Sequence, residues 1–247
     1  MDSFDRFVGV VRTLLSENGC PWDRAQTHES LKPCLLEECY EVIDAIDSDN
    51  TENLKEELGD VLLQVVFHSI LAQNEGKFTL DDTINGISDK MISRHPHIFG
   101  GESAENLVDR WEEIKKREKG YSTRTDAMRS VAKALPALVR GQKVIKKSMA
   151  QKQENITPVF EAAEECLKNL KQAENGNKDI QMELIGKLLM QILNISNFFE
   201  INAEFSLTNA LETYINRIED FENMSAAVGK SDEDTGLEDA DIFIRSL

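Results

Sequence analysis

The sequence is short of the residues that mark several classes of protein. It has four cysteines, five prolines and 6% aromatic residues among 247. The cysteines form no Cys-x-x-Cys pair, so we interpret them as small buried side chains of a protein in the reducing cytoplasm. No segment is long and apolar enough to span a membrane. Asp2, Asp5 and Arg6 interrupt any apolar run at the N-terminus, so we expect no signal peptide.

Basic residues are the minority. The chain has 28 lysines and arginines against 45 aspartates and glutamates, which gives a formal net charge of −17. Negative charge on this scale repels phosphodiester backbones and anionic lipids, so we expect neither a nucleic-acid polymer nor a membrane as a partner. A small phosphorylated molecule stays compatible with this charge, provided that a metal ion and local basic residues offset the field.

Strand-like alternation is hard to find, whereas helical periodicity recurs along the chain, and this predicts an all-α fold. The expected helices cover residues 3–18, a central hairpin over 35–71, 80–94, 105–119, 130–149, a second hairpin over 158–172 and 180–200, and 206–224. Gly120–Arg124 is predicted to be a flexible linker. After Gly229 the sequence has six acids against two bases, which predicts an acidic, flexible tail.

The central hairpin carries the same acidic pattern twice, because each half has a leucine followed by acids at positions +3 and +6. These acids are Glu38 and Glu41 in the first half and Glu57 and Asp60 in the second. At about 100° per residue, each pair borders the apolar stripe of its helix. The polar break at 47–53 is short, so the two helices are expected to pack antiparallel and to bring four carboxylates near one point.

Four clustered carboxylates repel one another or take up protons, and a hard divalent cation with oxygen ligands removes the conflict. Magnesium is the metal that this donor set predicts. The alternative is that the acids are ordinary charged helix flanks, which is the usual reason for a charged face. Gly59 favours the metal site. A glycine inside a helix costs about 1 kcal/mol relative to alanine, which indicates close approach of a neighbouring backbone.

Three further features have both a functional and a structural interpretation. Lys90 and Arg94 lie one helical turn apart and could bind phosphate, or could be solvated bases at a helix end. Trp111 could be a core residue or a stacking surface for a base. Trp22, in the loop over 20–28, could plug one end of the helical bundle or form the wall of a ligand pocket.

The second helix of the central hairpin becomes apolar nearly all round after Asp60. A helix of this kind is buried on several sides, which predicts a homodimer or a tightly packed tandem. His68 lies in this stretch, and we interpret it as an interior histidine with its hydrogen bonds satisfied rather than as a metal ligand.

In their order and spacing, these motifs resemble the MazG family of nucleoside triphosphate pyrophosphohydrolases. The acids match the Glu-Glu-x-x-Glu…Glu-x-x-Asp motif of that family, which runs here from Glu37 to Asp60. The resemblance extends over about residues 4–120. The other matching segments are Cys20-Pro21-Trp22-Asp23-x-x-Gln26-Thr27, Ser93-Arg94-His95-Pro96-His97-Ile98-Phe99 and Arg110-Trp111-Glu112-x-Ile114-Lys115.

The resemblance implies a dimeric all-α hydrolase that cleaves a nucleoside triphosphate to the monophosphate and pyrophosphate. It implies dependence on Mg²⁺, with Mn²⁺ as a possible substitute. The implied metal ligands are Glu38, Glu41, Glu57 and Asp60, and Glu38 or Glu41 could activate the attacking water. The implied substrate contacts are Lys90 and Arg94 to phosphate, Trp111 and Lys115 near the base and sugar, and Glu37 as a sugar contact or an outer contact of the metal site.

Longer members of that family carry two modules, and a second, degenerate copy is detectable here. Ile185–Leu189 aligns with Leu58–Leu62, which places Leu184 and Lys187 where the first copy has acids. Two alignments of the preceding helix are possible, and both leave the acid set incomplete. We therefore predict a module with an intact acidic site over 1–122, a degenerate module over 123–228 and the acidic tail over 229–247.

The leading functional hypothesis is a metal-dependent nucleoside triphosphate pyrophosphohydrolase that acts through the first module. The alternative, motivated by the degenerate second module, is a catalytically weak or inactive dimeric scaffold that binds nucleotides. A purely structural helical dimer is the third possibility.

Overall fold

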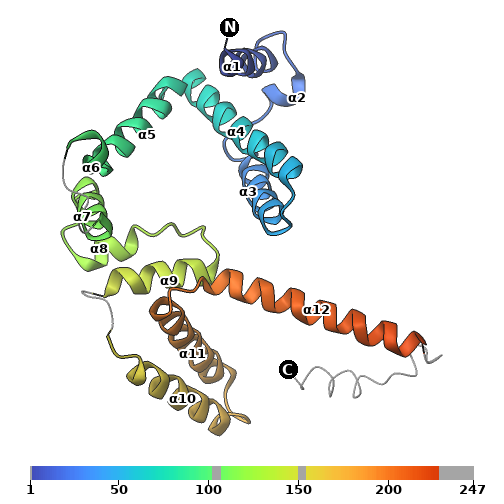
Figure 1. The fold of residues 1–247 in the computed structure, drawn as a ribbon, viewed down its shortest axis with the longest axis vertical. Coiled ribbons are helices and arrows are strands. Elements are labelled where there is room, and N and C mark those ends of the chain that lie inside the picture. Colours follow the sequence, from blue (N-terminus) through green and yellow to red (C-terminus); the bar gives the residue numbers. More distant parts are fainter. Residues whose placement is uncertain (1, 102–106, 150–153, 228–247) are drawn as a thin grey trace. The chain divides into compact units, whose positions relative to one another are not determined.

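The computed structural model describes residues 2–101, 107–149 and 154–227, and the regular structure within these ranges is entirely α-helical (Figure 1). The prediction of an all-α fold is therefore confirmed. The chain divides into two units, one up to Lys115 and one from Lys116 onward. The predicted tail over 229–247 lies outside the described residues.

The first unit is built on the hairpin of α3 (Lys32–Asp47) and α4 (Thr51–Asn74), which pack along one another as the sequence predicts. Only three residues join the two helices. Asp49 adopts a positive φ of 52°, and the Asn50 side chain accepts a hydrogen bond from the Asn53 backbone N–H. The turn and the N-cap together fix where α4 begins.

The core of the first unit lies on the second half of α4. α1 (Ser3–Leu14) packs there through the fully buried Val11, and Leu31, Val66, Phe67, Ile70 and Leu80 complete the cluster. The short helix α2 (Pro21–Arg24) stands where a loop was expected. Trp22 on this helix is 64% exposed, so the interpretation of Trp22 as a plug of the bundle is wrong.

α5 (Leu80–Arg94) covers the helix predicted over 80–94 and begins at a capping box. The Asp82 N–H donates to the Thr79 hydroxyl, and the Asp82 carboxylate accepts from the Thr79 N–H. α6 (Pro96–Phe99) replaces an expected loop because proline is well suited to the first position of a helix. α7 (Leu107–Lys119) follows, and residues 105 and 106 of the predicted helix lie outside the described residues.

The second unit contains five helices within the described residues. They are α8 (Arg124–Arg129), α9 (Ala137–Ser148), α10 (Thr157–Gln172), α11 (Lys178–Phe198) and α12 (Ala203–Ala227). The predicted hairpin of α10 and α11 is confirmed. The single helix expected over 130–149 is wrong, because Pro136 restricts the residue before it and α9 begins only after it. The predicted linker ends one residue early, since Thr123 caps α8.

Gln142 on α9 joins three parts of the second unit. Its side-chain amide donates to the Ile201 carbonyl at 2.8 Å, and its side-chain oxygen accepts from the Ala203 N–H at 2.9 Å. Its backbone carbonyl accepts from the Asn197 side chain at 3.1 Å. Ile145, Leu193 and Ala203 form the small core beside it.

No single helix in the described part of the chain has both the length and the apolar character needed to cross a membrane. α11 and Ala203–Met224 of α12 pass that test only when they are taken together, and a bend of 104° separates them.

Candidate functional site

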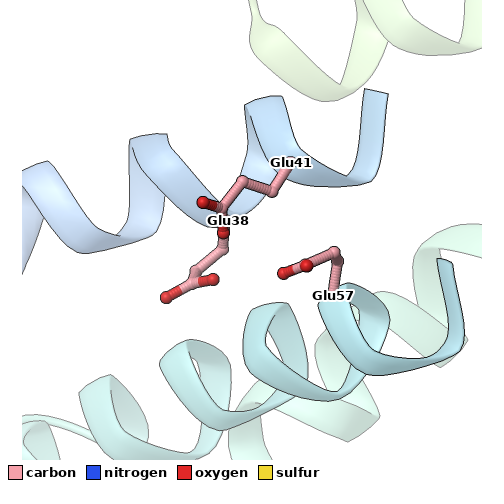
Figure 2. Close-up of side chains that lie close together, drawn as sticks. All are labelled: Glu38, Glu41 and Glu57. Atoms are coloured by element: carbon pink, nitrogen blue, oxygen red, sulfur yellow. The ribbon is translucent and has the colours of Figure 1, made fainter. Parts of the chain in front are cut away.

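Three carboxylates meet between α3 and α4. Glu38 and Glu41 come from α3 and Glu57 from α4, and one oxygen of each lies within 4.8 Å of the others (Figure 2). Helical spacing explains the arrangement, because residues three apart on α3 face the same way and the antiparallel helix brings Glu57 opposite them. Asp60 is not within this tightest group, although its charge acts on Glu38. The sequence prediction that these acids converge therefore holds for three of the four, with Asp60 beside them.

The electrostatics of this cluster oppose its ionisation. Partial burial raises the pKa of Glu38, and the charges of Asp60, Glu41 and Glu57 raise it further. Burial and the neighbouring Glu41, which shares a hydrogen bond with it, raise the pKa of Glu57. Like charges at this separation favour proton uptake, or a cation that takes the place of the protons. The donor set is all oxygen, and it fits a hard divalent metal.

Gly59 does not serve the purpose that the sequence suggested. A Cβ built at Gly59 would meet no atom within 4 Å, so no neighbouring backbone of the described residues approaches Gly59 closely. Gly186, at the matching place in the second hairpin, is equally open. The expectation of a close approach at Gly59 is therefore wrong for the single chain.

A basic and aromatic group lies on α5 and α7. The guanidinium of Arg94 is 5.8 Å from the centre of the Trp111 ring, and the Lys115 ammonium is 4.1 Å from it. These cations face the ring as in a cation–π pair. Lys90 lies one turn before Arg94 and is exposed. Glu37 lies on α3 beside Glu38, and its charge contributes to the raised pKa of Glu38.

This group is separate from the carboxylate cluster in the described residues. The main packing contacts run from α3 to α4, from α4 to α5 and from α5 to α6, so the two sets are connected through the α4–α5 corner. The structure thus forms two sets of predicted site residues, acids on one hairpin and bases with a tryptophan on the following helices.

The second hairpin has ion pairs where the first has clustered acids. Lys187 Nζ lies 2.5 Å from Glu183 Oε1 on α11, and Lys168 Nζ lies 3.9 Å from Glu165 Oε2 on α10. Among the described residues, the only group of carboxylates positioned to share a metal ion is the one on α3 and α4. Two of the acids in the second hairpin are thus paired with lysine ammonium groups, whereas the acids of the first hairpin face one another.

A histidine pair that the sequence did not predict connects the segment just before α3 to α4. The Nδ1 atoms of His28 and His68 are 2.8 Å apart, in rings whose planes differ by only 4°. The ring centres are 5.1 Å apart, so the nitrogens lie between them and the rings meet edge to edge. His28 Nε2 lies 3.8 Å from Glu75 Oε2. The interpretation of His68 as a satisfied interior histidine is consistent with this hydrogen bond.

The histidine pair is expected to make the stability of the protein depend on pH. Burial, and then the charge of His28, lower the pKa of His68 below its ordinary value of 6.5. The unfolded chain therefore binds more protons than the folded one as the pH falls below 6.5, and stability is lost in that direction. The melting temperature should fall between about pH 7.5 and about pH 5.5, and His68→Phe should reduce that fall.

A matched control for this prediction is His97→Phe, which removes an imidazole elsewhere in the chain. Thermal melts of the three proteins across the pH range are the measurement. An equal acid-induced fall in the wild type and His68→Phe would contradict a role for the pair.

The fold and the cluster together define an all-α protein whose helical hairpin presents converging carboxylates suited to a divalent metal. Comparison with known proteins makes this class specific. Residues 26–99 match the MazG nucleotide pyrophosphohydrolase domain. This segment includes α3, α4 and α5, and therefore all four predicted metal ligands.

Full-length relatives agree with the domain match. The chain is 39% identical over 250 residues to the nucleoside triphosphate pyrophosphohydrolase/pyrophosphatase MazG of Thermotoga maritima, covering 97% of this chain and 93% of that protein. It is 37% identical to the nucleoside triphosphate pyrophosphohydrolase of Escherichia coli K12, covering 93% of this chain and 90% of that one. An uncharacterized Bacillus subtilis protein, YabN, is 38% identical, and the match covers 96% of this chain and 50% of YabN.

The chain belongs to the MazG family of nucleotide pyrophosphohydrolases. The resemblance that the sequence motifs suggested is thereby confirmed, and it extends beyond residues 4–120 to nearly the whole chain.

Proposed function

We propose that this protein hydrolyses nucleoside triphosphates between the α and β phosphorus atoms and releases the monophosphate and pyrophosphate. The carboxylate cluster on α3 and α4, in a chain of this family, is the observation that carries the proposal. The activity named for the relatives from T. maritima and E. coli supports it.

Magnesium is the metal proposed for the site, with manganese as a substitute. Glu38, Glu41, Glu57 and Asp60 would hold it, since carboxylate oxygens are the ligands that both ions prefer. A bound cation supplies positive charge to the phosphate oxygens, where negative charge develops. Glu38 or Glu41 is proposed to accept the proton of the attacking water, a task that a carboxylate beside the metal can perform. For Glu38, the raised pKa favours this role.

The second set of residues is proposed to bind the substrate. Lys90 and Arg94, both on α5, are proposed to contact phosphate oxygens, for which the guanidinium fork of Arg94 is well shaped. Trp111 and Lys115 are proposed to contact the base and sugar, and Glu37 to act as a sugar contact or to support the metal ligands. The contacts of Arg94 and Lys115 with the Trp111 ring support a common role for these three residues.

We also propose that the protein is a cytoplasmic homodimer. α4 exposes Leu58, Leu62 and Val65 on the side away from its own core, and such a face needs a cover. We propose modules over 1–122 and 123–228, with the chemistry in the first. The ion pairs of Lys187 and Lys168 support a metal-free second module.

Product analysis tests the proposal directly. Full-length protein with Mg²⁺ and each of a panel of nucleoside triphosphates should yield monophosphate and pyrophosphate in equal amounts, and EDTA should abolish the reaction. Nucleoside diphosphate and inorganic phosphate as products would show cleavage between the β and γ phosphorus atoms, which would contradict the proposal. Nucleotide binding without turnover would favour the scaffold alternative instead.

A further inference from the structure

Gln64 is a buried polar residue that the proposed mechanism has not used. Only two polar side chains in the described structure are buried, Gln64 at 7% exposure and Ser69 at 3%. The Ser69 hydroxyl donates to the Val65 carbonyl at 2.8 Å. Gln64 Oε1 has no hydrogen-bond partner within the described residues. A buried carbonyl oxygen without a hydrogen-bond donor destabilises the folded state. We therefore expect a donor from outside the described residues to satisfy it.

The position of Gln64 on α4 indicates where that donor comes from. Around the helix, Gln64 lies about 20° from Glu57 and about 40° from Asp60. Along the helix it lies about 6 Å beyond Asp60, which is one turn toward the core. Gln64 therefore continues the carboxylate face of α4, at the boundary between the acid cluster and the apolar core that begins at Val66.

A metal site of the proposed kind brings suitable donors to this boundary. Magnesium and manganese usually keep several of their water ligands when carboxylates bind them. Those waters donate hydrogen bonds, and a neutral amide oxygen accepts one without adding a further negative charge to the cluster. The histidine on the next turn is not such a donor, because Gln64 Oε1 accepts no hydrogen bond from any described residue, and the Nδ1 of His68 is engaged by His28.

We propose that Gln64 is a positioning residue of the metal site, whose Oε1 accepts a hydrogen bond from a water bound to the cation. The inference rests on the proposed metal-dependent function. In this role Gln64 orients the metal-bound water from the side of the apolar core, while the carboxylates bind the ion.

The test uses the full-length protein, with Mn²⁺ as the probe and no nucleotide. Gln64→Met keeps the length of the side chain and removes the acceptor. Outer contacts of metal sites typically change affinity about 10–100-fold, so the Mn²⁺ dissociation constant should rise by at least about tenfold. The melting temperature of the metal-free variant should equal or exceed that of the wild type, because an unpaired acceptor has been removed. Proton relaxation of Mn²⁺-bound water should also change.

Ser69→Ala is the matched control, since Ser69 is equally buried but already bonded. It should leave the Mn²⁺ dissociation constant unchanged. An unchanged constant in Gln64→Met, with normal binding by the wild type, would overturn the role of Gln64 and leave the metal site intact. Absence of Mn²⁺ binding by the wild type would overturn the proposed metal site together with this inference. A metal-free Gln64→Met that melts well below the wild type would show that the amide serves folding instead.

Discussion

Glu41→Gln is expected to reduce pyrophosphate release by about 10²–10³-fold, a loss of the size typical when one preorganised group is removed from a reacting centre. Glutamine keeps the shape of the side chain but removes a negative charge from a cluster whose oxygens lie within 4.8 Å of one another. The loss should appear in kcat and in metal affinity together, because the proposed site loses a ligand. Turnover as a function of Mg²⁺ concentration up to saturation, with a pyrophosphate-coupled assay, is the measurement.

The matched control is Glu164→Gln, which makes the same change on α10 in the second hairpin. Glu164 is exposed and lies outside the carboxylate cluster. This variant should retain wild-type turnover. If Glu164→Gln were inactive while Glu41→Gln remained active, the chemistry would belong to the second unit, and the assignment of the first would be wrong.

Glu57→Gln is expected to stabilise the metal-free protein while it abolishes stabilisation by metal. Burial and Glu41 raise the pKa of Glu57 above its ordinary value of 4.5, so the folded state disfavours the ionised form. The folded chain therefore holds protons that the unfolded chain has released, and stability falls as the pH rises above 4.5. At neutral pH the carboxylate opposes folding until a cation arrives, and the amide avoids this penalty.

Thermal melts with and without Mg²⁺ measure both halves of this prediction. For the wild type, a ligand at a hundredfold excess over its Kd should add about 2.7 kcal/mol to the free energy of unfolding. For Glu57→Gln, the metal-free melting temperature should be higher and the Mg²⁺ response lost. A lower metal-free melting temperature would indicate that Glu57 makes a favourable contact rather than a repulsive one.

The hairpin and its acids could be predicted from sequence because both depend on local spacing. Acids at i and i+3 on two apolar-striped helices, joined by a short break, leave little freedom in where the carboxylates meet. The capping box of α5 was predictable for the same reason, since a threonine followed three residues later by an aspartate bonds locally.

Contacts between residues far apart in the sequence could not be predicted from the spacing of residues along the chain. His28 and His68 are forty residues apart, and nothing in either sequence neighbourhood indicates that their nitrogens meet. Gln64 stands at position +7 from Glu57, a spacing that could have drawn attention to it, but its missing partner is visible only once burial is known. The expectation at Gly59 was wrong because helix propensity shows only that glycine destabilises a helix. It does not show which contact, if any, offsets that loss of stability.

The polar residues along α4 have a mechanical consequence. Glu57, Gln64 and His68 lie within about 20° of one line down the helix. Their surroundings differ, because Glu57 lies in the carboxylate cluster, Gln64 is buried and His68 meets His28. If α4 slid one turn along α3, a carboxylate would enter the buried place of Gln64, at a cost of several kcal/mol. Sliding in that direction is thus opposed, and the three-residue turn over 48–50 limits separation of the two helices at the other end. These two features hold the carboxylates at their observed separation before any ligand binds.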